Sequence, residues 1–457
     1  MLSWIERARI GYLQGIWLHI ALGFAIYIFR PFAVIYFFAT IFFFVYRILT
    51  TGNKNNIALL AASYIMAAEV FLRMTISESI LPWDAGKYSV MAFVSLGLFF
   101  KGTSKKSVAY WIYILLLLPG VVYAAVTLDY STDVKKAVFF NLSGPICLGI
   151  AALYTYDRAI TKIQLQYLLW AMVMPVVAMT TYLFFYSPAT QDVLNGTSSN
   201  FALSGGFGPN QVSTALGIGM FAIFVQVFVQ MKNRMILIVN VLLLGLIAYR
   251  AIITFSRGGV LTAIVVCAAF LFIYYSGVST VRRKNISAYL VVIVGAMALT
   301  WFISSIRTRG LIDLRYANKD AAGRIKEDLS TGRKELISSE IDFFLDNPIM
   351  GIGVGKTKEY REEKYGILAA THNEISRMLS EHGIFGVFAL ILLILTPLSF
   401  RLQNRKNYLF YSFMAFWFLT INHSSMRIAA PALMYALALL NVVDEKKNPV
   451  HRKQVGP

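Results

Sequence analysis

Long apolar runs recur along nearly the whole chain, and they limit its fold more than any other feature. Each run holds roughly 17–25 residues, which is enough for a helix to cross about 30 Å of hydrocarbon. Backbone N–H and C=O groups find no water at that depth, so each crossing segment must be a helix that satisfies its own hydrogen bonds. The composition agrees, because 58% of the 457 residues are hydrophobic and only 14% are charged. We therefore predict an all-α, polytopic membrane protein.

The apolar runs predict about fourteen membrane spans. If the N-terminus is cytoplasmic, basic segments such as "KGTSKK", "VRRKN" and "RLQNRK" all fall on the cytoplasmic side, as the positive-inside rule requires. The formal net charge of +19 then reports membrane orientation rather than a nucleic-acid partner. The predicted spans are 13–30, 31–49, 57–79, 88–100, 107–128, 137–155, 165–186, 211–230, 235–254, 259–278, 286–305, 383–400, 407–422 and 429–443.

The same count of spans divides the chain into four regions and places its longest polar loop, about 306–371, outside the cell. The regions are N-terminal transmembrane helices (1–200), transmembrane helices with outer-face motifs (201–305), a long periplasmic loop (306–382), and C-terminal helices with a basic cytoplasmic tail (383–457). Within the loop, "STGRKELISSEIDFFLDNP" predicts an amphipathic helix on the membrane surface or the top of the bundle. Ser330 or Thr331 would cap it, and its apolar stripe is Leu336, Ile337, Ile341 and Phe344.

The loop segment "GIGVGKT" resembles a nucleotide-binding phosphate loop but fails as one. The first glycine of that pattern is replaced by Met350, and the segment follows an Asp-Asn-Pro turn instead of a buried strand. Its predicted position outside the cell also excludes ATP. We interpret the three glycines of 351–355 as a sharp turn. The two cysteines, Cys147 and Cys267, lie in apolar spans and are interpreted as small buried residues.

Four polar clusters fall on the outer side of the membrane: 205–211, 254–259, 331–333 and 371–383. In the second, Arg257 is followed by two glycines, so its guanidinium can approach a phosphate group at the mouth of a span. The alternative is an arginine that only reaches the lipid headgroups.

Two further arginines lie inside spans. Arg250 lies seven residues before Arg257, and both face one way if the helix continues. It has no local acidic partner, which favours a functional role. Arg73 follows Glu69 by one helical turn, so that pair is interpreted as structural.

His372 in the fourth cluster is a candidate general base, since imidazole accepts a proton near neutral pH. The alternative is a polar residue at the membrane boundary. His423 and Arg427, in the outside turn "INHSSMR", form a second candidate pair.

Taken together, these motifs resemble the O-antigen ligase and polymerase superfamily of bacterial envelope glycosyltransferases. The matching pieces lie between about residues 200 and 400. They are Gly208-Pro209-Asn210, Ser256-Arg257-Gly258-Gly259, Thr331-Gly332-Arg333 leading into "DNPIMGIGVG", and His372-Asn373 followed by Glu381 and Gly383. The resemblance implies a GT-C-like helical bundle with about a dozen spans in the bacterial inner membrane and a periplasmic active face.

The resemblance also implies a reaction and its participants. A glycan moves from undecaprenyl diphosphate to a hydroxyl of lipid A-core or of another glycan, without metal, cofactor or nucleotide. Arg257 and Arg333, with Arg250, would bind the diphosphate, and His372 would deprotonate the acceptor. The supporting residues would be Asn210, Ser256, Asn373, Arg377 and Glu381. The exclusion of a metal is incomplete, because carboxylates can bind divalent cations and three aspartates lie on or near outer loops: Asp84, Asp129 and Asp133.

Other functions compete with a ligase. A polymerase of the same superfamily would use the same donor and extend the lipid-linked glycan, and a ligase acting on protein is a further variant. A transporter of lipid-linked saccharides predicts repeat symmetry and charges near the bilayer midplane, whereas the polar groups here gather at one face. A purely structural scaffold leaves the unpaired arginines unexplained.

Overall fold

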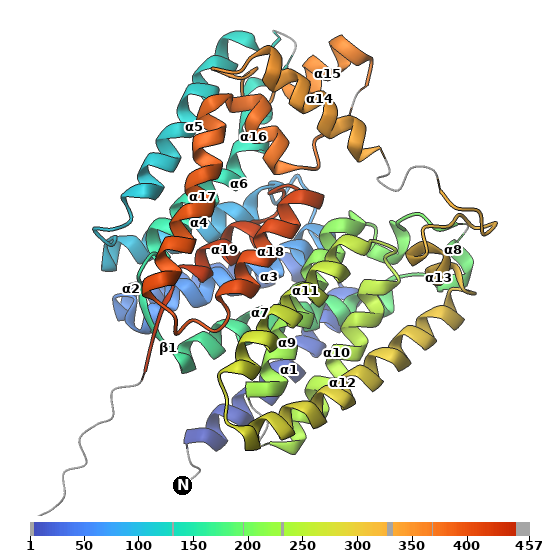
Figure 1. Ribbon diagram of the computed structural model, residues 1–457. Coiled ribbons are helices and arrows are strands. Elements are labelled where there is room, and N and C mark those ends of the chain that lie inside the picture. Colours follow the sequence, from blue (N-terminus) through green and yellow to red (C-terminus); the bar gives the residue numbers. More distant parts are fainter. Residues whose placement is uncertain are drawn as a thin grey trace, which may run out of the picture.

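The computed structural model describes residues 4–129, 132–194, 196–229, 233–326, 332–367 and 369–444, and it is helical almost throughout (Figure 1). In this part of the chain, eleven helices are long and apolar enough to cross a membrane, which confirms the predicted polytopic helical fold. They are α1 (Trp4–Ile28), α2 (Phe32–Thr51), α3 (Ile57–Thr75), α5 (Val108–Thr127), α6 (Val134–Thr155), α7 (Lys162–Tyr186), α9 (Pro209–Val229), α10 (Arg234–Ile252), α11 (Arg257–Ser276), α12 (Thr280–Arg307) and α17 (Ile384–Gln403).

The three remaining predicted spans correspond to shorter helices: α4 (Ala85–Lys101), α18 (Phe410–His423) and α19 (Ala429–Ala438). The prediction of one span over 429–443 is wrong at its end. The chain leaves the helix after Ala438, and β2 (Asn441–Val443) pairs in parallel with β1 (Ala159–Thr161). A strand of three residues is too short to show the apolar and polar alternation that marks a strand. The predicted helix was therefore extended through residues 441–443.

The centre of the bundle is formed by α3, α7, α9 and α19, whose apolar side chains are nearly all buried. Peripheral helices such as α2 and α12 instead expose large apolar side chains, including Phe42 and Phe302, as lipid-facing helices do. Cys147 is buried in α6 and Cys267 is partly buried in α11, and both are free thiols.

Helix α11 packs closely against α9 because Gly259 has no side chain. A Cβ added there would lie 2.1 Å from Ser213 Oγ and 2.3 Å from the Ser213 backbone carbon. Small residues at such crossings let two helix backbones approach. This contact brings the "GPN" segment at the start of α9 beside the "SRGG" segment at the start of α11.

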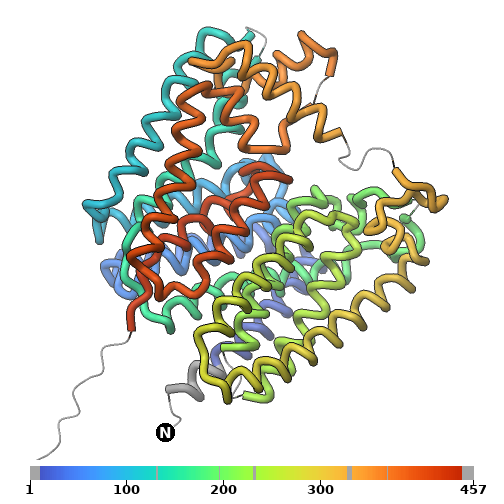
Figure 2. The backbone as a smooth tube through the Cα atoms, in the orientation of Figure 1, coloured from blue at the N-terminus to red at the C-terminus, as the bar shows by residue number. Residues whose placement is uncertain are grey.

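The segment between α12 and α17, which is the predicted outer loop, contains more helix than predicted. One amphipathic helix was predicted here, whereas the structure has α13 (Leu311–Tyr316), α14 (Arg333–Asp346), α15 (Thr357–Tyr365) and α16 (Glu374–His382). Figure 2 traces this segment from α12 back over the bundle to α17. The remaining short elements are η1 (Lys54–Asn56), α8 (Thr190–Val193) and η2 (Ala202–Ser204).

Helix α14 is the predicted amphipathic helix, but its buried face differs from the predicted one. Its buried residues are Ser339, Glu340 and Phe343, and the helix packs on α16. The predicted stripe of Leu336, Ile337, Ile341 and Phe344 is only partly buried. The reason is that α16 presents a polar surface, so α14 turns its own polar residues toward it. Ser330 and Thr331, the predicted caps, lie outside the described residues.

The glycine-rich segment 351–355 makes the sharp turn expected of it, with φ of 69°, 95° and 86° at its three glycines. Its backbone donors are occupied by protein acceptors. Gly353 N donates to Glu381 O at 3.2 Å, and Gly355 N donates to a Glu381 carboxylate oxygen at 3.0 Å. The segment therefore joins α14 to α16 and offers these N–H groups to no phosphate.

The contact at Gly259 gives a stability prediction. Gly259→Ala should lower the free energy of unfolding by about 1–3 kcal/mol, because the added methyl group overlaps the α9 backbone. The matched control is Gly295→Ala in α12, where nothing lies within 4 Å of an added Cβ and stability should not fall. Thermal unfolding of the detergent-purified proteins measures both. Equal midpoints for the two variants would contradict the close contact.

Candidate active site

The "GPN" and "SRGG" motifs form one hydrogen-bonded unit. Ser256 Oγ donates to Asn210 Oδ1 at 2.8 Å, and Ser213 Oγ donates to the Ser256 carbonyl at 3.2 Å. The Ser256 hydroxyl is used in this contact and does not cap α11, which begins at Arg257. Two predicted supporting residues, Asn210 and Ser256, thus hold the start of α11 in place.

Three arginines gather at this end of the bundle: Arg257, Arg315 and Arg333. Arg257 donates to the Asn318 side chain, and Arg315 Nε donates to the Phe255 carbonyl at 3.0 Å. Burial lowers the pKa of Arg315 and of Arg333, and the charge of Arg257 lowers both pKa values further. None of the three forms an ion pair with an acidic residue in the described ranges. Within the described ranges, the cluster therefore holds positive charge that no ion pair neutralises.

Arg315 is absent from the sequence prediction. It lies on the six-residue helix α13, 58 positions after Arg257, and no motif marks it. Only the return of the chain from α12 places it beside the start of α11.

A cavity of about 520 Å³ opens beside this cluster, within the size range of small-molecule sites. Because His372 also faces it, we call it the His372 cavity. It is lined by Ser198, Ser199, Asn210, Arg315, Gly332, Arg333, Glu335, Leu336, Ile367, Ala369 and His372. The structure thus brings together His372, Arg333 and Asn210, which are far apart in sequence, with Arg257 beside them.

His372 lies on the segment 369–373, which precedes α16, and is partly buried. Its backbone carbonyl accepts a hydrogen bond from Ser425 N at 3.1 Å. Burial lowers the pKa of His372 to about 4, and the positive charges of Arg427 and Arg333 act in the same direction. The imidazole is therefore neutral at pH 7 and able to accept a proton.

A buried ion pair holds the segment that carries His372. Arg361 and Glu340 are each about 1% exposed, and Arg361 Nη2 lies 2.5 Å from Glu340 Oε1. Arg361 Nη1 donates to the Ala369 carbonyl at 2.5 Å, and Thr371 Oγ1 donates to Glu340 Oε1 at 2.6 Å. This pair was not predicted, because a charged residue on a polar helix is usually exposed.

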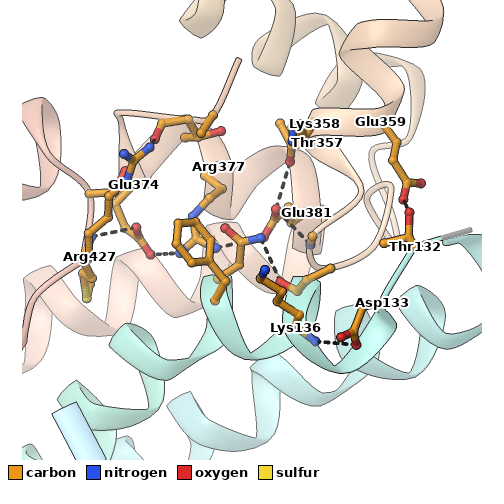
Figure 3. A pocket seen from close by; sticks show the side chains of 18 of the residues that line it. Thr132, Asp133, Lys136, Thr357, Lys358, Glu359, Glu374, Arg377, Glu381 and Arg427 are labelled. Atoms are coloured by element: carbon orange, nitrogen blue, oxygen red, sulfur yellow. Dashed lines mark hydrogen bonds and ion pairs between the residues drawn. The ribbon is translucent and has the colours of Figure 1, made fainter. Parts of the chain in front are cut away.

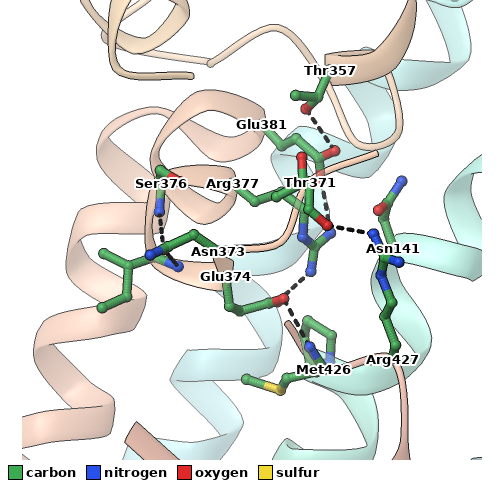
Figure 4. A network of polar contacts seen from close by, with 12 residues as sticks. Asn141, Thr357, Thr371, Asn373, Glu374, Ser376, Arg377, Glu381, Met426 and Arg427 are labelled. Atoms are coloured by element: carbon green, nitrogen blue, oxygen red, sulfur yellow. Dashed lines mark hydrogen bonds and ion pairs between the residues drawn. The ribbon is translucent and has the colours of Figure 1, made fainter. Parts of the chain in front are cut away.

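Arg377 and Glu381, two predicted supporting residues, belong to a second buried network (Figure 4). Arg377 pairs with Glu374 and, at 3.0 Å, with Glu381. Glu381 also accepts from Thr357 Oγ1 at 2.9 Å, and Glu374 accepts from Met426 N at 3.2 Å. The network fixes α16 against the 351–357 segment and the 424–427 turn. It lines a different cavity from the one that His372 faces.

Asn373 caps α16, since its Oδ1 accepts from Ile375 N at 2.8 Å and Ser376 N at 3.1 Å. It also donates to the Asn422 side chain at 2.9 Å. This predicted supporting residue therefore fixes where α16 begins, two residues after His372.

Arg250 lies apart from the three-arginine cluster. Its Nη2 donates to Ser187 Oγ at 2.5 Å and to the Leu203 carbonyl at 2.8 Å, so it braces the loop before α9. The expectation that Arg250 and Arg257 share one helix face does not hold, because α10 ends at Ile252 and α11 begins at Arg257. Arg73 lies 2.5 Å from Glu69, as predicted for a structural pair.

The two residues of the second candidate pair, His423 and Arg427, make different contacts. His423 contacts the Leu419 carbonyl at 2.9 Å and Thr214 Oγ1 at 3.4 Å, so both ring nitrogens have protein partners. Arg427 donates to the Thr371 carbonyl at 2.5 Å and contributes to the electrostatic environment of His372.

Two of the three aspartates that left the exclusion of a metal incomplete have other partners. Asp84 pairs with Lys87 at 2.6 Å, and Asp133 caps α6 by accepting from Lys136 N at 3.1 Å. At Asp129, the described hydrogen bonds involve only the backbone, whose N–H donates to a Glu359 carboxylate oxygen at 3.4 Å. Among the described residues, no three His, Cys, Asp or Glu side chains are grouped closely enough to hold a metal ion.

The fold and the site define a polytopic membrane protein with a cationic cavity and a neutral histidine at one end of its helices. Residues 242–391 match the family model described as O-Antigen ligase, so the chain carries an O-antigen ligase domain over this range. Ligases and polymerases of this family transfer lipid-linked glycans. The matched range includes Arg257, Arg315, Arg333 and His372. No curated protein matches the chain.

The buried pair behind His372 gives a second stability prediction. Glu340→Ala should lower the free energy of unfolding by ~3–5 kcal/mol, because it leaves the Arg361 charge buried without its partner. A Glu340→Leu, Arg361→Met double variant should lose less than the two single changes together. The control is Asp346→Asn, which breaks the exposed pair with Lys364 and should change stability by less than ~1 kcal/mol. Additive losses measured in a chemical unfolding series would show that the pair is not coupled.

Proposed function

We propose that this protein transfers a glycan from undecaprenyl diphosphate to an acceptor hydroxyl on the periplasmic face of the bacterial inner membrane. The acceptor we favour is lipid A-core, which makes the protein an O-antigen ligase. A polymerase of the same superfamily would use the same donor chemistry with a lipid-linked glycan as acceptor.

The observation that carries this proposal is the juxtaposition of His372 with arginines that have no acidic partner. The arginines repel one another, and a diphosphate in the His372 cavity would relieve that repulsion. A neutral imidazole facing the same cavity supplies a proton acceptor. A site that only bound a lipid headgroup would need the positive charge but not the base.

The proposed reaction is a direct displacement at the anomeric carbon. The acceptor oxygen forms a bond to that carbon as the bond to the diphosphate oxygen breaks, and the leaving diphosphate keeps the electron pair. His372 takes the hydroxyl proton, while Arg257, Arg315 and Arg333 stabilise the charge that develops on the diphosphate. Attack from the face opposite the leaving group inverts the anomeric configuration.

The proposed roles predict distinct effects of substitution. His372→Ala and Arg333→Ala should each lower transfer by roughly 100-fold or more, with unfolding temperatures close to that of the wild type. Arg257→Lys should also lose activity if the guanidinium group donates two hydrogen bonds to the phosphate at once. The matched control is Arg324→Ala, because this exposed arginine of the same outer segment pairs only with Asp320 among the described residues. A fully active His372→Ala enzyme would remove the proposed base.

The acceptor is identified in the source bacterium by deleting the gene and separating the envelope glycolipids on a gel. Complementation with His372→Ala serves as the inactive control. Bare lipid A-core, with long glycan accumulating on undecaprenyl diphosphate, is the result expected of a ligase. Core carrying a single repeat would identify a polymerase, and an unchanged profile would contradict both.

The low pKa of His372 predicts that kcat/KM falls only at an unusually low pH, which we call the acid limit. A base must be deprotonated to act, so kcat/KM should hold from neutral pH down to about pH 5 and fall near the pKa of about 4, rather than near 6.5. Arg427→Gln removes a positive charge that disfavours protonation, so this limit should move to higher pH. The donor is the same in both enzymes, so its own ionisation cancels in the comparison. An unchanged limit in Arg427→Gln would contradict the electrostatic origin of the shift.

A further inference from the structure

The turn between α18 and α19 holds the segment that carries His372. We call residues 424–429, which include the first residue of α19, the 424–429 turn. Ser425 N donates to the His372 carbonyl at 3.1 Å, and Arg427 Nη2 donates to the Thr371 carbonyl at 2.5 Å. The turn therefore contacts the backbone of the proposed base and of the residue before it.

The other side of the 424–429 turn is held by a buried ion pair of α3. The side chains of Arg73 and Glu69 are 4% and 1% exposed, and Arg73 Nη2 lies 2.5 Å from Glu69 Oε1. Arg73 Nη1 donates to the Arg427 carbonyl at 3.2 Å, and Glu69 Oε2 accepts from Ala429 N at 2.6 Å. The second contact gives a partner to an N–H at the start of α19, which the helix itself cannot supply. Each member of the pair thus binds one backbone group of the turn.

The backbone of the 424–429 turn is strained, so its shape depends on such contacts. Ser425 has a φ of 53°, in the left-handed region that residues with a side chain rarely adopt. A strained residue of this kind persists only where the surrounding structure holds it. Helix α6 adds a third support, because a Cβ added at Gly144 would lie 2.4 Å from Met426 Cβ and 2.5 Å from Met426 O.

The Arg427 side chain needs a fixed backbone, because it borders a cavity. Figure 3 shows it in the cavity wall together with Glu374 and Arg377. No carboxylate forms an ion pair with Arg427 in the described part of the chain. Its contact with the Thr371 carbonyl therefore depends on where its own backbone lies, and Arg73 holds that backbone.

The position of Arg427 also matters for the charge state of His372. Burial has the largest effect on the pKa of His372 and lowers it. Four side chains from the surrounding elements lower this pKa further, and in order of effect they are Arg427, Arg333, His423 and Arg361. A displaced 424–429 turn would thus move the His372 backbone and weaken the largest of these four effects.

We propose that Glu69 and Arg73 are positioning residues for the proposed base, and that they act through the 424–429 turn. The inference rests on the proposed function, because the position of His372 matters only if His372 takes part in the reaction. Neither α3 residue lines the His372 cavity, and both lie outside the matched range 242–391. The simpler alternative is an ion pair that only stabilises the helical bundle.

Arg73→Lys separates these two roles. Lysine keeps a positive charge beside Glu69 but lacks the second arm of the guanidinium group, which reaches the Arg427 carbonyl. We expect kcat for transfer to fall about tenfold or more, with the KM for the lipid-linked donor unchanged. The matched control is Tyr12→Phe, which also removes one buried hydrogen bond between distant helices, to Asn240 at 2.7 Å. The control should keep its kcat at a similar unfolding temperature, and a wild-type kcat in folded Arg73→Lys would overturn the proposal.

Two further variants disturb the 424–429 turn by other routes, so the test does not depend on whether Arg73→Lys folds. Glu69→Gln leaves one acceptor oxygen where Arg73 and Ala429 N now use two. Gly144→Ala pushes Met426 from the side of α6 and keeps the ion pair intact. Both should lower kcat as Arg73→Lys does, and an unchanged kcat in either folded variant would count against the proposal.

NMR of the full chain labelled at histidine gives a measurement that needs no activity. The chain has five histidines, and the His372 ring signal is the one lost in His372→Ala. In Arg73→Lys the midpoint of its pH titration should rise by roughly half a unit or more, because the Arg427 charge is no longer held nearby. Tyr12→Phe should leave the midpoint unchanged.

An unchanged His372 titration in Arg73→Lys would refute the positioning role, whatever happens to the rate of transfer. If the wild type transfers no glycan, the proposed function fails. The titration then still decides whether the ion pair of α3 holds His372 in place.

Discussion

The structure depends on the requirement that backbone polar groups in hydrocarbon be satisfied within helices. Chemistry that needs a mobile side chain or an irregular backbone is confined to the ends of those helices. Asn210 lies in the first turn of α9, Arg257 begins α11, and Arg333 begins α14. His372 lies just before α16, on a segment held by the buried pair of Arg361 and Glu340. The site is thus an assembly of helix starts, aligned by close contacts such as that at Gly259.

Charges at this end of the molecule fall into two groups with different consequences. The arginines Arg361 and Arg377 are buried and paired with carboxylates, so they fix the positions of α14 and α16. The arginines of the three-residue cluster have no such partners among the described residues, and their mutual repulsion lowers the pKa of Arg315 and Arg333. Paired charges hold this end of the molecule rigid, and unpaired charges supply the anion affinity that the proposed function needs. A protein that only needed stability would have little reason to keep the second group.

Much of the candidate site could be predicted from the sequence, because its motifs lie at the ends of long apolar runs, and those runs predict one side of the membrane for all of them. The helical fold, the Arg73 and Glu69 pair and the turn at 351–355 followed from local patterns. Arg315, the pair of Glu340 and Arg361, and the β1–β2 pairing did not, since each depends on contacts between segments far apart along the chain. The buried face of α14 was misassigned for a related reason. Periodicity identifies an apolar stripe but not a neighbour that is itself polar.

The parallel pairing of β1 with β2 has a consequence for how the protein is made. Residues 159–161 are synthesised long before residues 441–443, which they contact. Helix α19, which leads into β2, is buried and packs against α3, α4, α6 and α18. During synthesis the helices before α19 therefore enter the membrane without one of the four helices that form the centre of the bundle. A chain that stops short of residue 429 lacks both this helix and the strand that pairs with β1.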